Sequence, residues 1–440
     1  MPRVIISSYK SSAGKTLITS GLIKALSNRL KVRGFKVGPD FIDPGYLQLA
    51  SGYPAINLDI WLMGEDGVIN SLMNYTKGFD IGIIEGVMGL YDGIGYKYST
   101  YELSKVTKTP IVVIVDCFEL SYTAGAIVKG LKDFMNADVR GVIFNKVASE
   151  SHYLDCKASL DPSVKPLGYV RFDKELQLPS RHLGLYTSIE YSKKASEVIS
   201  AIAKEIESNI DLDELINIAN EAEELKQEYP GDGKIEANED KVAAIALDAA
   251  FNFYYSQNLD IIKRKGYKLK FFSPLSNEVV DDADFIYIGG GYPELYLETL
   301  EQATNTKFWI KKKSYEGTAI LAECGGLMYV SKYLIDENDR KFRMANIFDV
   351  EIKAKDKLTI GYTKLETVND NIISRKGSVI NAHEFHISKP LVINEENRFA
   401  FKMIKGKGLF NGFDGLINQN TLASYSHFHF LKLQNYLIAS

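Results

Sequence analysis

The chain has 440 residues, of which 45% are hydrophobic and 25% charged, a composition typical of soluble globular proteins. Its formal net charge is −4 and it has no long basic run, which argues against nucleic-acid binding. No apolar stretch approaches the ~20 residues of a membrane span, and the N-terminus becomes polar too soon for a signal peptide. We therefore expect a cytoplasmic enzyme of two or three domains, without a membrane partner.

The first half of the chain alternates short apolar segments with amphipathic ones. Between the first two apolar segments, residues 17–30 carry Ile18, Leu22, Leu26 and Leu30 on one helical face. The apolar segments are rich in β-branched residues, as expected of strands buried on both faces of a parallel sheet. This alternation predicts an α/β fold with a doubly wound parallel sheet. The expected strands are 4–7, 35–37, 81–84, 111–115 and 142–144.

A stretch rich in Asp and Glu separates this pattern from a second set of expected strands. We interpret residues 208–240 as a solvated acidic helix followed by a turn-rich linker, with a boundary near residue 235. Residues 1–207 then form a first domain and residues 241–440 a second α/β domain. The expected strands of the second domain are 242–247, 269–272, 285–288 and 319–322.

Residues 8–16 follow the first expected strand and lead directly into the first expected helix. A small-residue loop in this position directs backbone N–H groups at an anion, and the helix dipole adds positive charge. Tyr9 stands where phosphate loops usually have glycine, but Lys10, five residues before Lys15, resembles the extra lysine of the deviant P-loop class. We expect this loop to bind ATP, with contacts from Lys10, Ser12, Gly14, Lys15, Thr16 and, after the strand at 142–144, Asn145.

Acidic residues follow two expected strands, at the edge where ligands of open α/β sheets collect. Glu85 comes directly after residues 81–84, and glycines behind it leave room for a ligand. Because Mg²⁺ prefers carboxylate and hydroxyl oxygens, we expect it to bind Thr16, Asp43 and Glu85. The remaining candidates, for binding the acceptor or for phosphoryl transfer, fit turn capping equally well and are Asp40, Asp43 and Asp92.

Cys324 follows the expected strand at 319–322 and precedes two glycines and an apolar helical pattern that continues through Leu334. Such a strand-to-helix turn is typical of a nucleophile elbow, and the helix N-terminus is expected to lower the thiol pKa. A cysteine nucleophile needs an imidazole partner, for which His427 is the leading candidate. The glycine turn after residues 285–288 would supply an oxyanion hole from Gly290 and Gly291.

The other cysteines and histidines have simpler interpretations. Cys117 and Cys156 are expected to be small buried apolar residues. His383 and His386 have a spacing found in metal sites, but no third ligand lies near them in the sequence, and we favour a loop that faces the substrate.

Taken together, the segments 8–16, 38–46, 85–93 and 289–291 and Cys324 resemble the cobyrinic acid a,c-diamide synthase family of glutamine-dependent amidotransferases. The likeness covers nearly the whole chain and includes further segments at 57–59, 178–185, 250–255 and 272–275. The resemblance implies an N-terminal synthetase domain similar to dethiobiotin synthetase and a C-terminal class I-type glutaminase domain.

The resemblance also implies a reaction. ATP, with Mg²⁺, would phosphorylate an acetate carboxylate of a corrinoid, and ammonia released from glutamine by Cys324 and His427 would displace the phosphate. The chain departs from class I glutaminases at one point, because His429 stands where they carry the glutamate of a His-x-Glu pair. We therefore predict only a dyad of Cys324 and His427, and consider a homodimer possible.

Two alternatives remain open at this stage. The acceptor could be nickel-sirohydrochlorin or hydrogenobyrinic acid, since each offers acetate side chains on a tetrapyrrole. More distantly, the chain could be a P-loop switch ATPase in which Lys10 bridges a dimer and the second domain only binds a partner. That alternative gives Cys324 and His427 no role.

Overall fold

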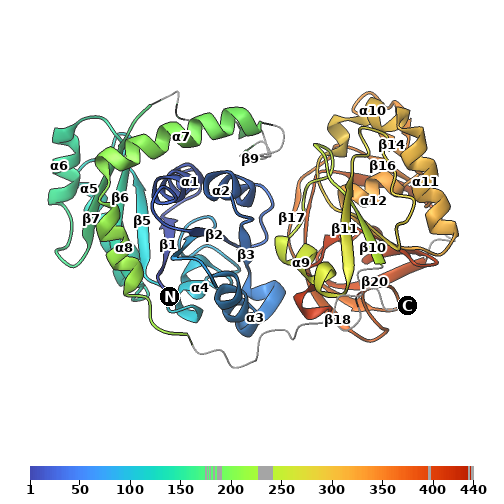
Figure 1. Cartoon of the computed structure of the whole chain (residues 1–440), viewed down its shortest axis with the longest axis horizontal. Coiled ribbons are helices and arrows are strands. Elements are labelled where there is room, and N and C mark those ends of the chain that lie inside the picture. Colours follow the sequence, from blue (N-terminus) through green and yellow to red (C-terminus); the bar gives the residue numbers. More distant parts are fainter. Residues whose placement is uncertain are drawn as a thin grey trace. The chain divides into compact units, whose positions relative to one another are not determined.

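The computed structural model describes residues 1–173, 191–225, 241–394 and 398–434, together with the single positions 176, 178, 180, 181, 184, 185 and 437. The chain divides into two compact units, Met1–Asp232 and Gly233–Ser440, which are considered one at a time (Figure 1). The expected boundary near residue 235 and part of the segment 178–185 lie outside the described residues.

In the described part of the first unit, seven parallel strands form one sheet in the order β3-β2-β4-β1-β5-β6-β7. All five strands expected from the sequence are present, and β3 and β7 extend the sheet at its two edges. The short strands β8 (Ser180–Arg181) and β9 (Gly184–Leu185) pair only with each other. The strands of the sheet are β1 Arg3–Ser8, β2 Val32–Val37, β3 Ile56–Leu58, β4 Ile81–Glu85, β5 Ile111–Asp116, β6 Val139–Val147 and β7 Lys165–Arg171.

Helices cover both faces of this sheet, which confirms the doubly wound fold. Successive strands from β1 to β3 are added in one direction along the sheet, and those from β3 to β7 are added in the opposite direction. Because the crossover connections are right-handed, α1 and α2 lie on one face of the sheet and α3 to α6 on the other. Helices α7 and α8 pack in the same apolar cluster as α1 and α2. The helices are α1 Lys15–Leu26, α2 Asp43–Ser51, α3 Ile60–Tyr75, α4 Thr100–Val106, α5 Thr123–Asp133, α6 Glu150–Ala158, α7 Ser192–Asn209 and α8 Leu212–Asn220.

Helix α8 corrects the interpretation of residues 208–240 as an exposed helix and linker. Its apolar side chains Leu215, Ile218 and Ala219 are buried and belong to the core of the first unit. The acidic residues of the helix lie on its other face. The short amphipathic pattern was therefore missed because the surrounding sequence is so rich in acidic residues. The first unit therefore continues past residue 207.

In the described part of the second unit, ten strands form a mixed sheet in the order β11-β10-β12-β13-β22-β21-β20-β17-β18-β23. The first five strands in this order, β11, β10, β12, β13 and β22, pair in parallel. Each later strand in the order, beginning with β21, pairs antiparallel with the one before it. The sequence analysis predicted four of the five parallel strands but neither β22 nor the antiparallel part. The strands are β10 Lys241–Ala246, β11 Tyr267–Phe272, β12 Phe285–Ile288, β13 Ala319–Glu323, β17 Thr359–Thr367, β18 Val379–His386, β20 Arg398–Lys405, β21 Phe413–Asn418, β22 Thr421–Ser424 and β23 Ser426–His427.

A smaller sheet and short helices complete the second unit. The helix after Cys324 ends at Val330, and Leu334 lies in strand β14, so the expectation of a helix through Leu334 is wrong. Ser331 adopts an extended conformation that ends the helix. The remaining elements are α9 Ser256–Arg264, α10 Leu297–Gln302, α11 Thr304–Tyr315, α12 Gly325–Val330, η1 Pro293–Leu295, η2 Phe430–Lys432, β14 Tyr333–Ile335, β15 Lys341–Arg343, β16 Val350–Lys353 and β19 Lys389–Ile393.

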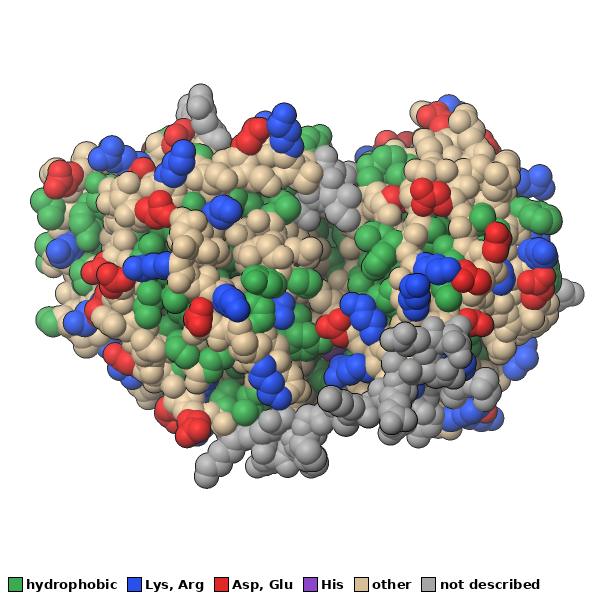
Figure 2. Space-filling view, viewed as in Figure 1, with side chains coloured by type: hydrophobic (Ala, Val, Ile, Leu, Met, Phe, Trp, Pro, Cys, Tyr) green, Lys and Arg blue, Asp and Glu red, His purple; other side chains and the backbone are tan. Residues whose placement is uncertain are grey.

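Charged side chains of both signs are scattered among one another on the face shown in Figure 2. Among the described residues, none of the helices combines the length and the apolar character needed to cross a membrane.

Candidate active sites

The phosphate loop lies between β1 and α1, as the sequence predicts. Ser12 and Gly14 have positive φ angles of 60° and 94°, so the backbone turns sharply before α1 begins at Lys15. The buried Lys15 ammonium donates hydrogen bonds to Ser8 Oγ (3.0 Å) and to the carbonyl oxygen of Lys10 (3.1 Å). The lysine therefore lies along the loop, where phosphates would bind to backbone N–H groups.

Asn145, in strand β6, holds this loop in place. Its Nδ2 donates a hydrogen bond to the Ala13 carbonyl oxygen (2.9 Å), and its Oδ1 accepts one from the backbone N–H of Lys146 (2.9 Å). A Cβ atom on Gly14 would collide with that amide, so both packing and the φ angle require glycine. The structure thus gives Asn145 a role in shaping the loop, and its contact with the nucleotide stays a prediction.

Lys10, the extra lysine of the loop, is half-exposed and lies 3.7 Å from Asp116 Oδ2 at the end of β5. Lys146 contacts the same oxygen at 2.8 Å. Two ammonium groups thus share one carboxylate beside the phosphate loop, and the local excess of positive charge suits a polyphosphate.

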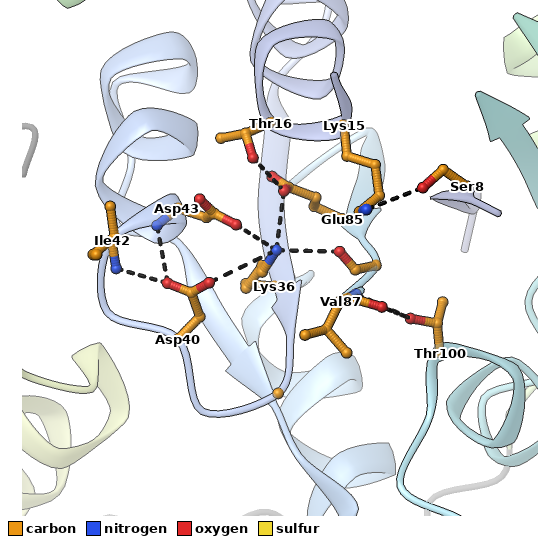
Figure 3. Close-up of polar contacts among 12 residues, drawn as sticks. Ser8, Lys15, Thr16, Lys36, Asp40, Ile42, Asp43, Glu85, Val87 and Thr100 are labelled. Carbon is orange, nitrogen blue, oxygen red and sulfur yellow. Dashed lines mark hydrogen bonds and ion pairs between the residues drawn. The ribbon is translucent and has the colours of Figure 1, made fainter. Parts of the chain in front are cut away.

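A buried lysine that the sequence analysis missed organises the acidic residues nearby (Figure 3). Lys36 lies near the end of β2, opposite Glu85 on β4. Its Nζ contacts Asp43 Oδ2 at 2.6 Å, Glu85 Oε1 at 3.0 Å and Asp40 Oδ2 at 3.9 Å. Thr16 Oγ1 donates a hydrogen bond to the same Glu85 oxygen at 2.8 Å. Strand β4, helix α1 and the segment from β2 into α2 therefore bring four predicted site residues into the cluster around Lys36. Lys36 could have been found from the sequence as a charged residue in an apolar strand.

Burial and mutual charge shift the pKa of every ionisable group in this cluster. Burial raises the pKa of Glu85 to about 8 although Lys36 lowers it, and burial with Asp43 raises the pKa of Asp40 to about 7. Burial opposes the charged forms of Lys36 and Asp43, but their ion pair outweighs it, so the pKa of the lysine is raised and that of Asp43 lowered. Burial and the Lys36 charge lower the pKa of Lys15 to about 8.

Part of the predicted magnesium site fits this geometry. Glu85 Oε2 is buried and has no hydrogen-bond partner within the described residues, an arrangement that a bound cation would satisfy. Those residues contain no group of three His, Cys, Asp or Glu able to hold a metal alone. At nucleotide sites, however, Mg²⁺ uses one or two carboxylates with phosphate oxygens and water. Thr16 and Glu85 suit such a site, whereas the Asp43 carboxylate is paired with Lys36.

The two other acidic candidates make hydrogen bonds typical of turns. Asp40 Oδ1 accepts from the backbone N–H groups of Ile42 (2.7 Å) and Asp43 (3.1 Å), which orders the start of α2. Asp92 is exposed, and its Oδ2 accepts from the backbone N–H of Gly89 (2.9 Å). Only Asp40 also faces the Lys36 cluster.

In the second unit, Cys324 has the backbone of a nucleophile elbow. Its φ and ψ angles are 49° and −99°, a strained conformation for a residue other than glycine. Its backbone N–H donates a hydrogen bond to the Ser424 carbonyl oxygen on β22 (2.7 Å), which holds the turn against the sheet. A Cβ atom on Gly326 would collide with the carbonyl oxygen of Ile288, so the tight turn requires a small residue there, as expected.

The thiol of Cys324 is in a less polar environment than the sequence suggests. It is buried, and its Sγ donates to the Phe385 carbonyl oxygen at 3.3 Å. Burial, with a smaller contribution from Glu294, raises the pKa of this thiol and outweighs the lowering by the backbone N–H of Gly325 at the helix N-terminus, so the net shift is opposite to the expected one. The thiolate must therefore form by proton transfer to a neighbouring base.

The glycine turn and His427 meet at this elbow. A Cβ atom on Gly290 would lie 2.5 Å from His427 Cε1, and one on Gly325 would lie 3.1 Å from the backbone nitrogen of Gly291. The predicted oxyanion glycines therefore line the turn that carries Cys324, next to the predicted base. Gly289 is set apart from them, because its N–H donates to the Tyr254 hydroxyl (2.8 Å).

His427 is fully buried between an acid and a second imidazole. Its Nδ1 lies 3.6 Å from Glu323 Oε2, and its ring stacks on that of His383 with centroids 4.9 Å apart. His383 and His386 lie in strand β18, so the expectation that they belong to a loop is wrong. His429 packs against Tyr255, and its Nδ1 accepts from a backbone N–H two residues on.

Comparisons with known proteins give matches over both units. Residues 4–185 match the family model of the CobQ/CobB/MinD/ParA nucleotide binding domain, and residues 241–434 match that of the CobB/CobQ-like glutamine amidotransferase domain. The cobyrinate a,c-diamide synthases of Sulfurisphaera tokodaii and Sulfolobus acidocaldarius are each 55% identical to the chain, over 99% of both partners. The chain belongs to the cobyrinate a,c-diamide synthase family. It is an enzyme of the amide-forming ligase type.

A more distant member of the family, from Methanocaldococcus jannaschii, is 39% identical over 98% of this chain and 96% of its own. Among solved structures, PurLQS from Thermotoga maritima aligns with a TM-score of 0.33 at 16% identity, over 43% of this chain and 87% of that one, a likeness too slight to support an argument.

Proposed function

We propose that this member of the family amidates the a and c acetate carboxylates of cobyrinic acid, with ATP as the activating co-substrate and glutamine as the nitrogen donor. The observation that carries the proposal is the presence, in one chain, of a lysine-rich phosphate loop and of a cysteine elbow with an adjacent buried imidazole. The names of relatives 55% identical over their full length support cobyrinate as the acceptor.

In the first unit, the chemistry is activation of a carboxylate, because ammonia does not displace an oxide ion. Lys10 and Lys15 offset the charge that builds up as the γ-phosphoryl group approaches an anionic acceptor. The Lys36 ammonium lies where it can attract an acceptor carboxylate into the same cluster. Thr16 and Glu85 would hold Mg²⁺, which when bound neutralises phosphate charge.

In the second unit, the Sγ proton of Cys324 passes to His427 Nε2 as sulfur bonds to the side-chain amide carbon of glutamine. The imidazolium returns that proton to the amide nitrogen, the C–N bond breaks and ammonia leaves. Water then loses a proton to His427 and adds to the thioester, whose C–S bond breaks to give glutamate and the thiol. Backbone N–H groups at Gly290 and Gly291 would stabilise the oxyanion at both stages.

Three further predictions belong to this proposal. The enzyme is expected to act in the cytoplasm, to use neither nucleic acid nor membrane as a partner, and to form a homodimer. Size-exclusion chromatography with light scattering measures the last of these directly.

Substitution Cys324→Ser tests the proposal. We expect glutamine-dependent amidation of cobyrinic acid to fall by roughly 1,000-fold or more, because a hydroxyl has a far higher pKa than a thiol. Amidation driven by ammonium salts at raised pH should continue, since it needs only ATP and the first unit. A panel with nickel-sirohydrochlorin and hydrogenobyrinic acid identifies the acceptor. Normal glutamine use by this variant would contradict the assignment of the cysteine.

A further inference from the structure

Glu323, the residue before the nucleophile, is the last residue of strand β13 and is almost completely buried. A carboxylate in that position is costly unless charged or polar groups compensate it. Its neighbours come from two other strands of the same sheet, β12 and β23, and from the residue after β23. These neighbours indicate the role of the buried acid.

Both carboxylate oxygens of Glu323 have defined partners. Oε2 accepts a hydrogen bond from the Tyr287 hydroxyl at 3.0 Å, and Oε1 accepts one from the backbone N–H of Phe428 at 3.3 Å. Burial keeps the Tyr287 pKa well above its usual value, so the phenol stays a donor. With both oxygens held, the carboxylate has a fixed orientation, and the same Oε2 lies 3.6 Å from Nδ1 of His427.

We propose that Glu323 is the positioning acid of the glutaminase site, holding the Nδ1 side of His427 so that Nε2 exchanges the proton with Cys324. The inference rests on the proposed function of Cys324 and His427. It assigns to a residue beside the nucleophile the role that a carboxylate after the histidine has in class I glutaminases, where this chain has His429.

The physical reason is the charge that appears on the imidazole during turnover. When His427 takes the thiol proton it becomes a cation in a site with no solvent exposure. The nearby His383 supplies no negative charge to offset it, and burial, which lowers the pKa of His383 well below its usual value, disfavours a second cation there. A carboxylate on the Nδ1 side stabilises the cation and fixes the tautomer, the part that the third residue of a catalytic triad performs.

Other buried groups near the site have different partners. Glu384 on β18 accepts hydrogen bonds from the backbone N–H groups of Lys407 (3.2 Å) and Gly408 (2.6 Å), a structural arrangement. Asp414 accepts from Ser424 Oγ and from the backbone of Tyr425 and Ser426, which shapes the turn before β23. Glu384 is therefore a matched control, a buried glutamate of the same sheet that accepts backbone hydrogen bonds.

The experiment compares Glu323→Gln, Glu384→Gln and Cys324→Ser in the full-length protein. Glutamate release gives kcat and KM for glutamine, and ammonium-driven amidation reports the first unit. For Glu323→Gln we expect kcat to fall by roughly 100-fold or more, the order contributed by an oriented general base. KM should change by less than about 3-fold, and ammonium-driven amidation by less than about 2-fold. Glu384→Gln should keep kcat within about 5-fold.

A kcat for Glu323→Gln within about 5-fold of the wild type, or an equal loss in Glu384→Gln, would overturn the inference. Should Glu323→Gln fail to fold, Glu323→Asp replaces it, because the charge is kept but withdrawn from Nδ1. We then expect kcat to fall with KM unchanged, and an unchanged kcat would overturn the inference. Retained glutamine use in Cys324→Ser would instead reject the proposed function itself, so the two failures are distinguishable.

Discussion

In the first unit, the last residue of strand β4, Glu85, lies beside the ammonium of Lys36, whereas in the second unit the last residue of β13, Glu323, lies beside the imidazole of His427. Both acids are buried at the carboxyl end of a parallel strand. The first belongs to a dense set of ionisable groups around Lys36, whereas the second is held between a phenol and an imidazole.

The difference follows from what each site would bind. Nucleotide phosphates and an acceptor carboxylate bring charge with them, so the site of the first unit needs fixed cations and a place for a divalent ion. Glutamine brings a neutral amide, and what changes there during turnover is the position of one proton between Cys324 and His427. Electrostatic changes should therefore damage the first site most, and steric changes the second.

Among the substitutions that test this comparison, Lys15→Ala is expected to have the largest effect on activity. Removing the buried ammonium should lower ATP-dependent amidation by roughly 1,000-fold with either nitrogen donor, since the half-exposed Lys10, which lies beside Asp116, does not replace a buried charge at the phosphates. Glutamine hydrolysis should survive, because Lys15 has no part in the thiol chemistry. Near-normal amidation in this variant would show that the phosphate loop is wrongly assigned.

Gly290→Ala is the steric counterpart in the second unit. Its added Cβ would lie 2.5 Å from His427 Cε1 and would displace the imidazole. We expect glutamine-dependent amidation to fall by roughly 100-fold while the ammonium-driven reaction stays normal. Gly130→Ala, where no atom lies within 4 Å of the added Cβ, serves as the neutral control. Equal glutamine use by both variants would show that Gly290 does not belong to the glutaminase site.

Glu85→Gln sharpens the contrast at the charged site. The substitution keeps the shape of the side chain but removes the charge that a hard cation requires, so the Mg²⁺ concentration for half-maximal activity should rise by about 10-fold or more. The exposed Glu65→Gln is the control. If the Mg²⁺ titration of Glu85→Gln matched that of the wild type, Glu85 would not be a magnesium ligand and would serve only as an ion-pair partner of Lys36.

The smallest expected effect is a difference in acid stability between the units. Burial lowers the pKa of His386 to about 4 and that of His429 to about 3. Between pH 6.5 and about 4 the unfolded chain binds more protons at these residues, so the second unit loses stability as the pH falls, by about 2 kcal/mol for each histidine at pH 5. Glu85 has the opposite sign, because its raised pKa makes protonation favour the folded state.

Hydrogen exchange followed by mass spectrometry at pH 7 and pH 5 measures this difference, since it resolves peptides from each unit. Protection should decrease first in β18, which contains His386, and around η2, which begins after His429. Earlier loss of protection in β4 would reverse the expected order.

Most of the parallel strands could be predicted because doubly buried strands such as 111–115 are continuous apolar runs, whereas the parallel strands β3, β7 and β22 were not predicted. The antiparallel strands β17 to β21 could not, because their half-exposed faces mix polar and apolar residues over irregular lengths. Leu334 was misplaced for a related reason, since a short apolar segment fits a strand as well as a helix.

The geometry of the candidate sites was predictable where it depends on the order of neighbouring residues, as in the loop at Lys15 or the elbow at Cys324. Lys36 and Glu323 were missed because their importance depends on neighbours far away in the sequence. The argument that singled out Glu85, an acid at the end of an apolar strand, applies equally to Glu323. At that strand end, however, the sequence analysis assigned a role to the adjacent Cys324 and none to Glu323.

Helix α8 has a practical consequence for dividing this enzyme into its parts. Ile218 packs against Gly141 on strand β6 of the first sheet, and the Arg3 guanidinium donates to the carbonyl oxygens of Glu223 (2.5 Å) and Thr107 (2.8 Å). A fragment that stops at residue 207 would expose apolar sheet surface and leave a buried guanidinium short of an acceptor. Separate expression of the synthetase half should therefore begin from fragments that extend beyond Glu223.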